Sequence, residues 1–342
     1  MTLEDEYRGD LSVLVEHIGG LDPPDLDTRF ALCFDLGAES YLEVTPAQEG
    51  TVAAVDGSNA MLLDAGYISV ALLRAAVCGF SAGSRRFRSV TPLRLVPLGH
   101  EARDGSFASL YRECFGSDPE ASVRDDEPER TAAVMRDTLE YWAALRAADR
   151  LSRGDLLVLD GALRVSHASH EPVLIRLIQV CAKKGIRLCA VTKRTAITWG
   201  GGLPLVPAAL ALAKTHSISP PWVLRVREEG LDVTPYQQWQ HGATCIAALH
   251  PRSSLAFKIE VPGPTSDAVL AQTASLLAGW ADDGRVTGYP YPLLDAHRTA
   301  RIPADVLRQV KYDLLAGIGQ SGSNPDRFQA LFGDIHDEFA RY

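Results

Sequence analysis

Two aspartates occupy equivalent places in the sequence, each at the end of an apolar run and directly before a glycine. The first run is Thr51-Val-Ala-Ala-Val-Asp56-Gly-Ser-Asn59, and the second is Asp155-Leu-Leu-Val-Leu-Asp160-Gly161. Aliphatic and β-branched residues favour strands and the small polar tail favours a turn, so we expect each carboxylate at a strand end. Carboxylates from neighbouring elements are the ligands that hard divalent cations prefer. The pair therefore predicts a metal site, with two ordinary turns as the alternative.

The composition is that of a folded protein with an acidic balance. The 342 residues are 46% hydrophobic and 23% charged, and the formal net charge is −9. These values allow a sizeable core in one large domain or two ordinary ones. The negative charge argues against a protein coated in nucleic acid, but it does not exclude an enzyme with a local basic channel.

Cysteine usage and hydropathy predict the compartment. The six cysteines are scattered, mostly in apolar runs, and form no Cys-x-x-Cys pair, so we expect free thiols in a reducing compartment. The acidic N-terminus lacks the apolar stretch of a secretory signal, and no apolar run approaches membrane-spanning length. We therefore expect a cytoplasmic protein without a membrane segment.

The hydrophobic pattern predicts a mixed α/β core. Three strand-like runs come first, one ending at Asp56 and two over 67–78 and 86–97, and we interpret them as an antiparallel meander. A helix, strand, helix, strand and helix follow at 129–150, 155–160, 171–184, 186–192 and 204–214. This is the element order of the ribonuclease H-like fold, a mixed five-stranded sheet with flanking helices.

Further elements are expected on both sides of this core. Residues 1–20 predict a short amphipathic helix, and residues 29–45 alternate in a way that fits either a strand or an extension. After the core we expect additional strands and helices. The predicted strands are 222–228, 243–249 and 255–261, and the predicted helices are 265–282, 303–316 and 325–340.

A third acid is expected on the long helix 129–150. In the ribonuclease H-like fold the first strand, the first long helix and the fourth strand bring acidic side chains together. Glu140 is the candidate on this helix, beside apolar neighbours. Asp137 lies one turn earlier and is the alternative for the same role. A solvated helix carboxylate is the alternative reading of Glu140 itself.

A second chemically rich segment runs from Gly288 to Arg301. Its two prolines are expected to hold the chain extended, so that Tyr289 and Tyr291 face opposite ways. We expect this rigid loop to deliver a tyrosine, Asp295 and His297 to the site, with His297 in a short turn that opens a helix.

These segments together resemble the NurA family of DNA end-processing nucleases, which work with a HerA-type hexameric ATPase. The similar motifs are Asp56-Gly-Ser, Asp160-Gly and Gly288-Tyr-Pro-x-Pro-Leu-x-x-Ala-His297, and the resemblance runs from about residue 50 to residue 305. One departure is Ala162, which follows Asp160-Gly where a serine is common. The resemblance implies a ribonuclease H-like core, a homodimer and manganese-dependent cleavage of DNA. The expected activities are 5′-to-3′ exonuclease action on single and double strands and endonuclease action on single strands, in DNA end resection and repair.

The resemblance also implies roles for individual residues. The expected metal ligands are Asp56, Glu140, Asp160 and His297, and the expected catalytic set adds Lys193 and Tyr289. They would hold two Mn²⁺ ions about 3.5–4 Å apart, with Mg²⁺ as the alternative, to activate a water and stabilise the leaving oxygen. Lys193 would neutralise charge on the phosphate, unless it is an ordinary surface lysine. Tyr289 would hydrogen-bond a phosphate oxygen or stack on a terminal base.

The partners follow from the same resemblance. Basic clusters at 84–88, 183–184 and 193–194 are candidates for a DNA channel, with solvated turns as the alternative. We assign residues 46–342 to the nuclease domain and residues 1–45 to an extension for dimerisation or ATPase docking, unless helix 1–20 packs on its own core. Two other functions stay open: an inactive module that binds nucleic acid or the ATPase, and a nuclease that acts on RNA.

Overall fold

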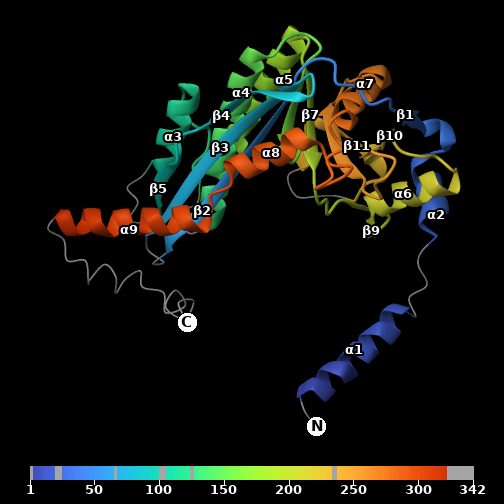
Figure 1. The fold of residues 1–342 in the computed structure, drawn as a ribbon, viewed down its shortest axis with the longest axis horizontal. Helices are drawn as coiled ribbons and strands as arrows, with labels where there is room; N and C mark the ends of the chain where they lie inside the picture. The colour runs from blue at the N-terminus through green and yellow to red at the C-terminus, as the bar shows by residue number, and fades with distance from the viewer. Residues whose placement is uncertain are drawn as a thin grey trace.

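One large sheet forms the centre of the protein (Figure 1). The computed structural model describes residues 3–19, 25–64, 68–99, 105–123, 127–232 and 237–321. Its strands are β1 (Tyr41–Glu43), β2 (Val52–Asp64), β3 (Ser69–Ser81), β4 (Ser84–Val90), β5 (Arg94–Leu98), β6 (Leu156–Asp160), β7 (Arg187–Thr192), β8 (Thr198–Trp199), β9 (Leu203–Pro204), β10 (Trp222–Arg225), β11 (Gly242–Ala248) and β12 (Phe257–Pro262). Within the described ranges, ten of these strands join in the order β1-β10-β11-β12-β7-β6-β2-β3-β4, with β5 also paired to β3, and β8 and β9 form a separate pair.

Helices cover both faces of this sheet. The α-helices of the described residues are α1 (Leu3–Gly19), α2 (Leu26–Phe34), α3 (Ser106–Phe115), α4 (Pro128–Arg150), α5 (Glu171–Lys184), α6 (Leu205–Thr215), α7 (Asp267–Ala278), α8 (Tyr291–Ala300) and α9 (Ala304–Gln320), and all but α1 pack near the sheet. Alternate residues of β2 show the two layers: Val55 packs in the cluster of α4 and α5, whereas Ala54 packs in the cluster of α7 and α8. The predicted helix 325–340 lies outside the described residues. Among the described helices, none is long and apolar enough to cross a membrane.

The ribonuclease H-like core predicted from the sequence is confirmed. Strands β4, β3 and β2 pair antiparallel, β6 runs parallel to β2, and β7 runs parallel to β6. This is a mixed five-stranded sheet. The later strands β12, β11 and β10, together with β1, extend it antiparallel beyond β7.

Asp56 does not end its strand, so that prediction is wrong. β2 continues to Asp64 because β3 pairs with it over the whole of that length. Its parallel partner β6 is shorter, and the last paired residues are Val55 and Leu159. The two aspartates therefore follow the last pair of the β2–β6 ladder, and their carboxylates still meet at one sheet edge.

Two segments with prolines also differ from expectation. The predicted strand 86–97 is divided into β4 and β5, with Pro92 between them. The segment around Pro292 is helical, not an extended loop, because proline is tolerated in the first turn of a helix, where its missing N–H has no intrahelical partner. His297 consequently lies inside α8 rather than in a turn that opens a helix.

The segment assigned to the N-terminal extension divides in two. Phe30 and Phe34 of α2 are buried against Trp199, and β1 pairs with β10, so this part packs onto the main sheet. Helix α1 lies apart from the sheet (Figure 1), and its role in assembly stays a prediction. Its exposed apolar residues are Leu11, Val13, Leu14, Val15 and Ile18. All six cysteines are free, as expected.

Candidate metal centre

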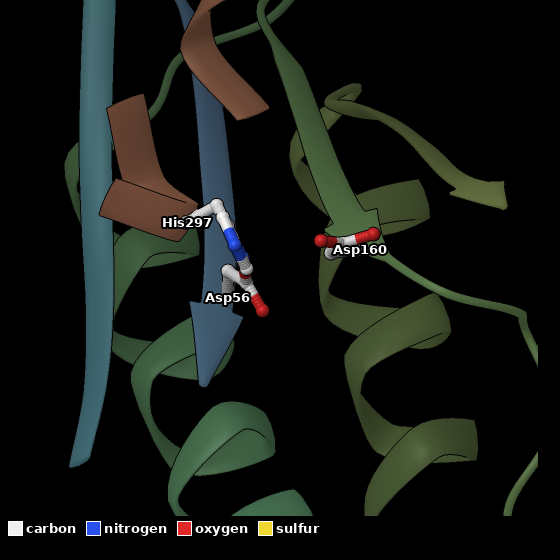
Figure 2. Close-up of side chains that lie close together, drawn as sticks. All are labelled: Asp56, Asp160 and His297. Atoms are coloured by element: carbon white, nitrogen blue, oxygen red, sulfur yellow. The ribbon is translucent and has the colours of Figure 1, made fainter. Parts of the chain in front are cut away.

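Asp56, Asp160 and His297 meet where the β2–β6 ladder ends (Figure 2). One possible ligand atom from each side chain lies within 4.8 Å of those of the other two. Nδ1 of His297 is 2.7 Å from Oδ2 of Asp56. Figure 2 shows Asp56 and His297 side by side, with Asp160 facing them from the end of β6. Two carboxylates and one imidazole thus point into a common space.

Helix α8 positions the histidine through its buried face. Leu293, Ala296 and Ala300 are buried at the spacing of one helix face, which seats α8 on the sheet. His297 follows Leu293 by four residues and so lies on nearly the same side of the helix, above Asp56. The Ala-His pair of the sequence motif therefore combines a small packing residue with a functional one.

The electrostatics of this group favour a cation. Burial of Asp56, together with the negative charge of Asp160, raises the pKa of Asp56 to about 6, although Lys193 and His297 act in the opposite direction. The Lys193 ammonium donates to Oδ2 of Asp160 and supplies one positive charge. Two carboxylates brought together at partial burial repel each other, and a bound divalent cation relieves that cost.

Glu140 reaches the same region from α4, which packs on the face of the sheet opposite to α8. The glycine after Asp56 permits this, because a methyl group at Gly57 would overlap Oε1 of Glu140. The same oxygen lies 3.1 Å from Nε of Arg136, and burial raises the pKa of Glu140 well above its usual range. Glu140 is not a member of the three-residue group. Its expected role as a metal ligand therefore stays a prediction.

Asp137, the alternative helix acid, is already engaged on both oxygens. It accepts from Arg136 at 2.7 Å and from the hydroxyl of Ser166 at 2.8 Å. Among the residues that the structure describes, Glu140 has a single ionic contact, with Arg136. The hydrogen bonding therefore favours Glu140 over Asp137 as the acid that is available to a ligand.

Tyr289 lies beside the acids but deep in the protein. Its ring is 5.3 Å from that of Phe257, and the Lys193 ammonium is 5.7 Å from its centroid. The hydroxyl has no hydrogen-bond partner among the residues that the structure describes. Burial and the charges of Asp160 and Asp56 raise the pKa of Tyr289, which keeps this hydroxyl protonated.

A cavity of about 730 Å³ opens over the site. Of the expected residues it is lined by Asp56, Asp137, Glu140, Asp160, Lys193 and His297, together with Arg194, whereas Tyr289 is not among its lining residues. Asp295 is not among its lining residues and pairs with Arg85 at 3.0 Å, so the expectation that it joins His297 in the site is wrong. The basic clusters at 84–88 and 183–184 do not line this cavity either.

The sequence analysis missed three basic residues of the cavity wall, which are Arg136, Arg164 and Lys258. Arg136 precedes Glu140 by four residues on α4, a spacing that places it on the same helix face. Lys258 lies in β12 and forms a buried ion pair with Glu260. The available signal is the alternation of charged and apolar residues in Phe257-Lys-Ile-Glu-Val261, which by itself indicates only a strand.

Comparison with known proteins agrees with the fold. Residues 50–198 match the family described as the NurA domain. The crystal structure of the NurA nuclease from Sulfolobus solfataricus superimposes with a TM-score of 0.54 and 12% identity, over 94% of this chain and 98% of that chain. A crystal structure of NurA bound to dAMP and manganese superimposes with a TM-score of 0.55 and 9% identity, over 95% and 99%. At these identities the likeness shows a shared fold. No curated protein matches the chain in sequence.

Proposed function

We propose that this chain, whose residues 50–198 match the NurA domain, is a manganese-dependent deoxyribonuclease. The observation that carries the proposal is the convergence of Asp56, Asp160 and His297 within 4.8 Å. His297 lies beyond the matched residues, so the site combines the NurA domain with the C-terminal helix α8. The relative that binds dAMP and manganese supports a nucleotide and this metal as ligands here.

The donor set fits manganese. Two carboxylates and one imidazole provide oxygen and nitrogen ligands, which suit Mn²⁺, and the imidazole favours Mn²⁺ over the alternative Mg²⁺. Asp56, Asp160 and His297 would hold a first ion, and Glu140 would contribute to a second from the α4 side. When bound, such cations activate a water and stabilise the charge of the leaving oxygen.

The remaining residues act on the phosphate and on the ligands. Lys193 carries a positive charge beside Asp160 and can neutralise a phosphate oxygen at the mouth of the site. Tyr289 keeps a protonated hydroxyl near the two acids and can donate to a phosphate oxygen. The hydrogen bond between Asp56 and His297 fixes the orientation of the imidazole ring.

We extend the proposal to substrate, polarity and partners on the basis of the resemblance to NurA. The expected activities are 5′-to-3′ exonuclease action on single- and double-stranded DNA and endonuclease action on single strands. The expected partner is a HerA-type hexameric ATPase, the expected assembly is a homodimer, and the expected role is DNA end resection and repair.

Digestion of end-labelled DNA with Mn²⁺ tests this function. Wild-type protein is incubated with single- and double-stranded DNA labelled at either end, with and without the ATPase, beside Asp56→Asn and Asp160→Asn. The matched control is Asp295→Asn, a carboxylate on the same helix as His297 that pairs with Arg85 outside the cavity. We expect cleavage by the wild type and by the control but not by the two site variants. DNA that is bound yet left intact by the wild type under all conditions would instead identify a binding module.

A further inference from the structure

The cavity has a second charged element, which the metal centre does not use. Lys258 and Glu260 of β12 form an ion pair whose side chains are 5% and 0% exposed. Both alternate with apolar residues that pack under α7 and α8, so both point to the opposite face of the sheet, the side of α4 and α5. Burying two charges costs free energy, and a buried pair by itself is weak support for stability. Its position in a cavity wall indicates a ligand.

Glu260 is fully engaged by the protein. Its Oε1 accepts from the Lys258 ammonium, and its Oε2 accepts from the backbone N–H of Leu163. Gln240 lies 3.5 Å from Oε1. Glu260 therefore anchors the loop that follows Asp160 and also fixes the end of the Lys258 side chain. Each oxygen of Glu260 thus has a protein donor, and its side chain is 0% exposed.

Lys258, in contrast, has donors to spare. A lysine ammonium offers three N–H donors, and Glu260 is its only side-chain partner within the part of the chain that the structure describes. Lys258 lines the cavity that holds Asp56 and Asp160. Buried donors need acceptors, so the two remaining donors call for an anionic or polar group inside the cavity.

The sheet places Lys258 at a distance from the metal ligands. Strand β7 lies between β6, which ends at Asp160, and β12, where Lys258 is paired with Thr192. Two strand spacings put the backbones of Lys258 and Asp160 about 10 Å apart. The nearer lysine, Lys193, already contacts Asp160. Lys258 is therefore suited to an anion other than the one at the cation site.

We propose that Lys258 binds a second phosphodiester of the nucleic-acid strand, next to the one that is cleaved, and that Glu260 is its buried positioning partner. The inference rests on the proposed nuclease function. A lysine recognises phosphate as a point charge, so the subsite reads the backbone and not the base. It would fix which phosphodiester enters the metal centre.

Methylphosphonate substitution of single phosphates tests the subsite. Binding of a short single-stranded DNA is measured in Ca²⁺, so that cleavage is not required, for the wild type and for Lys258→Met. Each phosphate in turn is replaced by a neutral methylphosphonate. At one position the wild type should lose about tenfold or more in affinity, as expected for a hydrogen bond to a charged group. Lys258→Met should lose the same amount with ordinary DNA and nothing further at that position.

The controls separate folding and function from the subsite. Lys214→Met removes an exposed lysine from the last turn of α6 and should bind as the wild type does. If Lys258→Met folds poorly because Glu260 is left unpaired, the double variant Lys258→Met/Glu260→Gln serves instead, since a glutamine oxygen can still accept from Leu163. The subsite would be overturned if the affinity losses from Lys258→Met and from the methylphosphonate added up at every position, or if Lys258→Met bound DNA as the wild type does. Cleavage by the wild type would still leave the nuclease proposal standing. A wild type that shows the coupled loss but never cleaves would refute the nuclease and the placement beside a cleaved bond, and would leave Lys258 as a phosphate-binding residue.

Discussion

Replacing Asp56 by asparagine should stabilise the metal-free protein while it removes the response to manganese. The pKa of Asp56 rises from 3.8 to about 6 in the folded chain, first because of burial and then because of Asp160. Each pKa unit corresponds to about 1.36 kcal/mol, so an ionised Asp56 costs the folded state up to about 3 kcal/mol at pH 7.5. Asparagine has nearly the same shape, carries no charge and can keep a hydrogen bond to His297.

The pH dependence has a definite sign. A carboxyl whose pKa is raised on folding takes up a proton in the folded state, so the protein loses stability as pH rises from about 4 to about 6. The advantage of Asp56→Asn should therefore be full at pH 7.5 and disappear only below the unfolded pKa of 3.8, where the wild-type carboxyl is protonated in both states.

Melting curves with and without manganese check both halves of this prediction. In EDTA at pH 7.5 the variant should melt up to about 6 °C above the wild type, at about 2 °C per kcal/mol for a chain of this size. With Mn²⁺ at about 100 times its Kd, the wild type should gain about 2.7 kcal/mol and the variant should gain none. A variant less stable than the wild type in EDTA would refute the account of burial and repulsion. An equal gain with Mn²⁺ would refute the role of Asp56 as a ligand.

Three further outcomes are expected. Glu140→Gln should reduce the rate of DNA cleavage much more than Asp137→Asn, because both oxygens of Asp137 are engaged by the protein; the reverse ranking would assign the helix acid to Asp137. Gly57→Ala should cost about 1–3 kcal/mol in urea unfolding and lower the cleavage rate, because the added methyl group overlaps Glu140; unchanged stability and activity would show that α4 moves freely. Reducing agent should alter neither melting nor cleavage, since all six cysteines are free, and a large loss of stability would reveal a disulfide.

Much of the core was predictable because its signals are local. Apolar runs and helix-length polar patterns located β6, β7, α4 and α5 to within about two residues, typical of strongly periodic segments. The two Asp-Gly sequences predicted that Asp56 and Asp160 lie close together, and this holds because their strands are parallel neighbours. The extent of β2 was not predictable in the same way, because it is set by the length of its partner β3.

The rest of the site depends on tertiary contacts that no local pattern carries. Pro290 and Pro292 favour an extended chain, yet the proline in the first turn of α8 is compatible with a helix that places His297 over Asp56. The sequence around Lys258 and Glu260 indicates only one strand among several. Their roles depend on the loop residue Leu163, which donates to Glu260, and on the cavity that Lys258 lines. The small size of Gly57 matters only once α4 is placed against β2.

The most direct test of the metal centre is the location of manganese itself. Crystals of the wild-type protein grown with Mn²⁺ would be measured on both sides of the manganese absorption edge, and the anomalous difference map would be calculated. The account predicts a manganese peak between Asp56, Asp160 and His297, which already lie within 4.8 Å of one another. A map with no peak there, or with manganese bound only elsewhere on the protein, would contradict it.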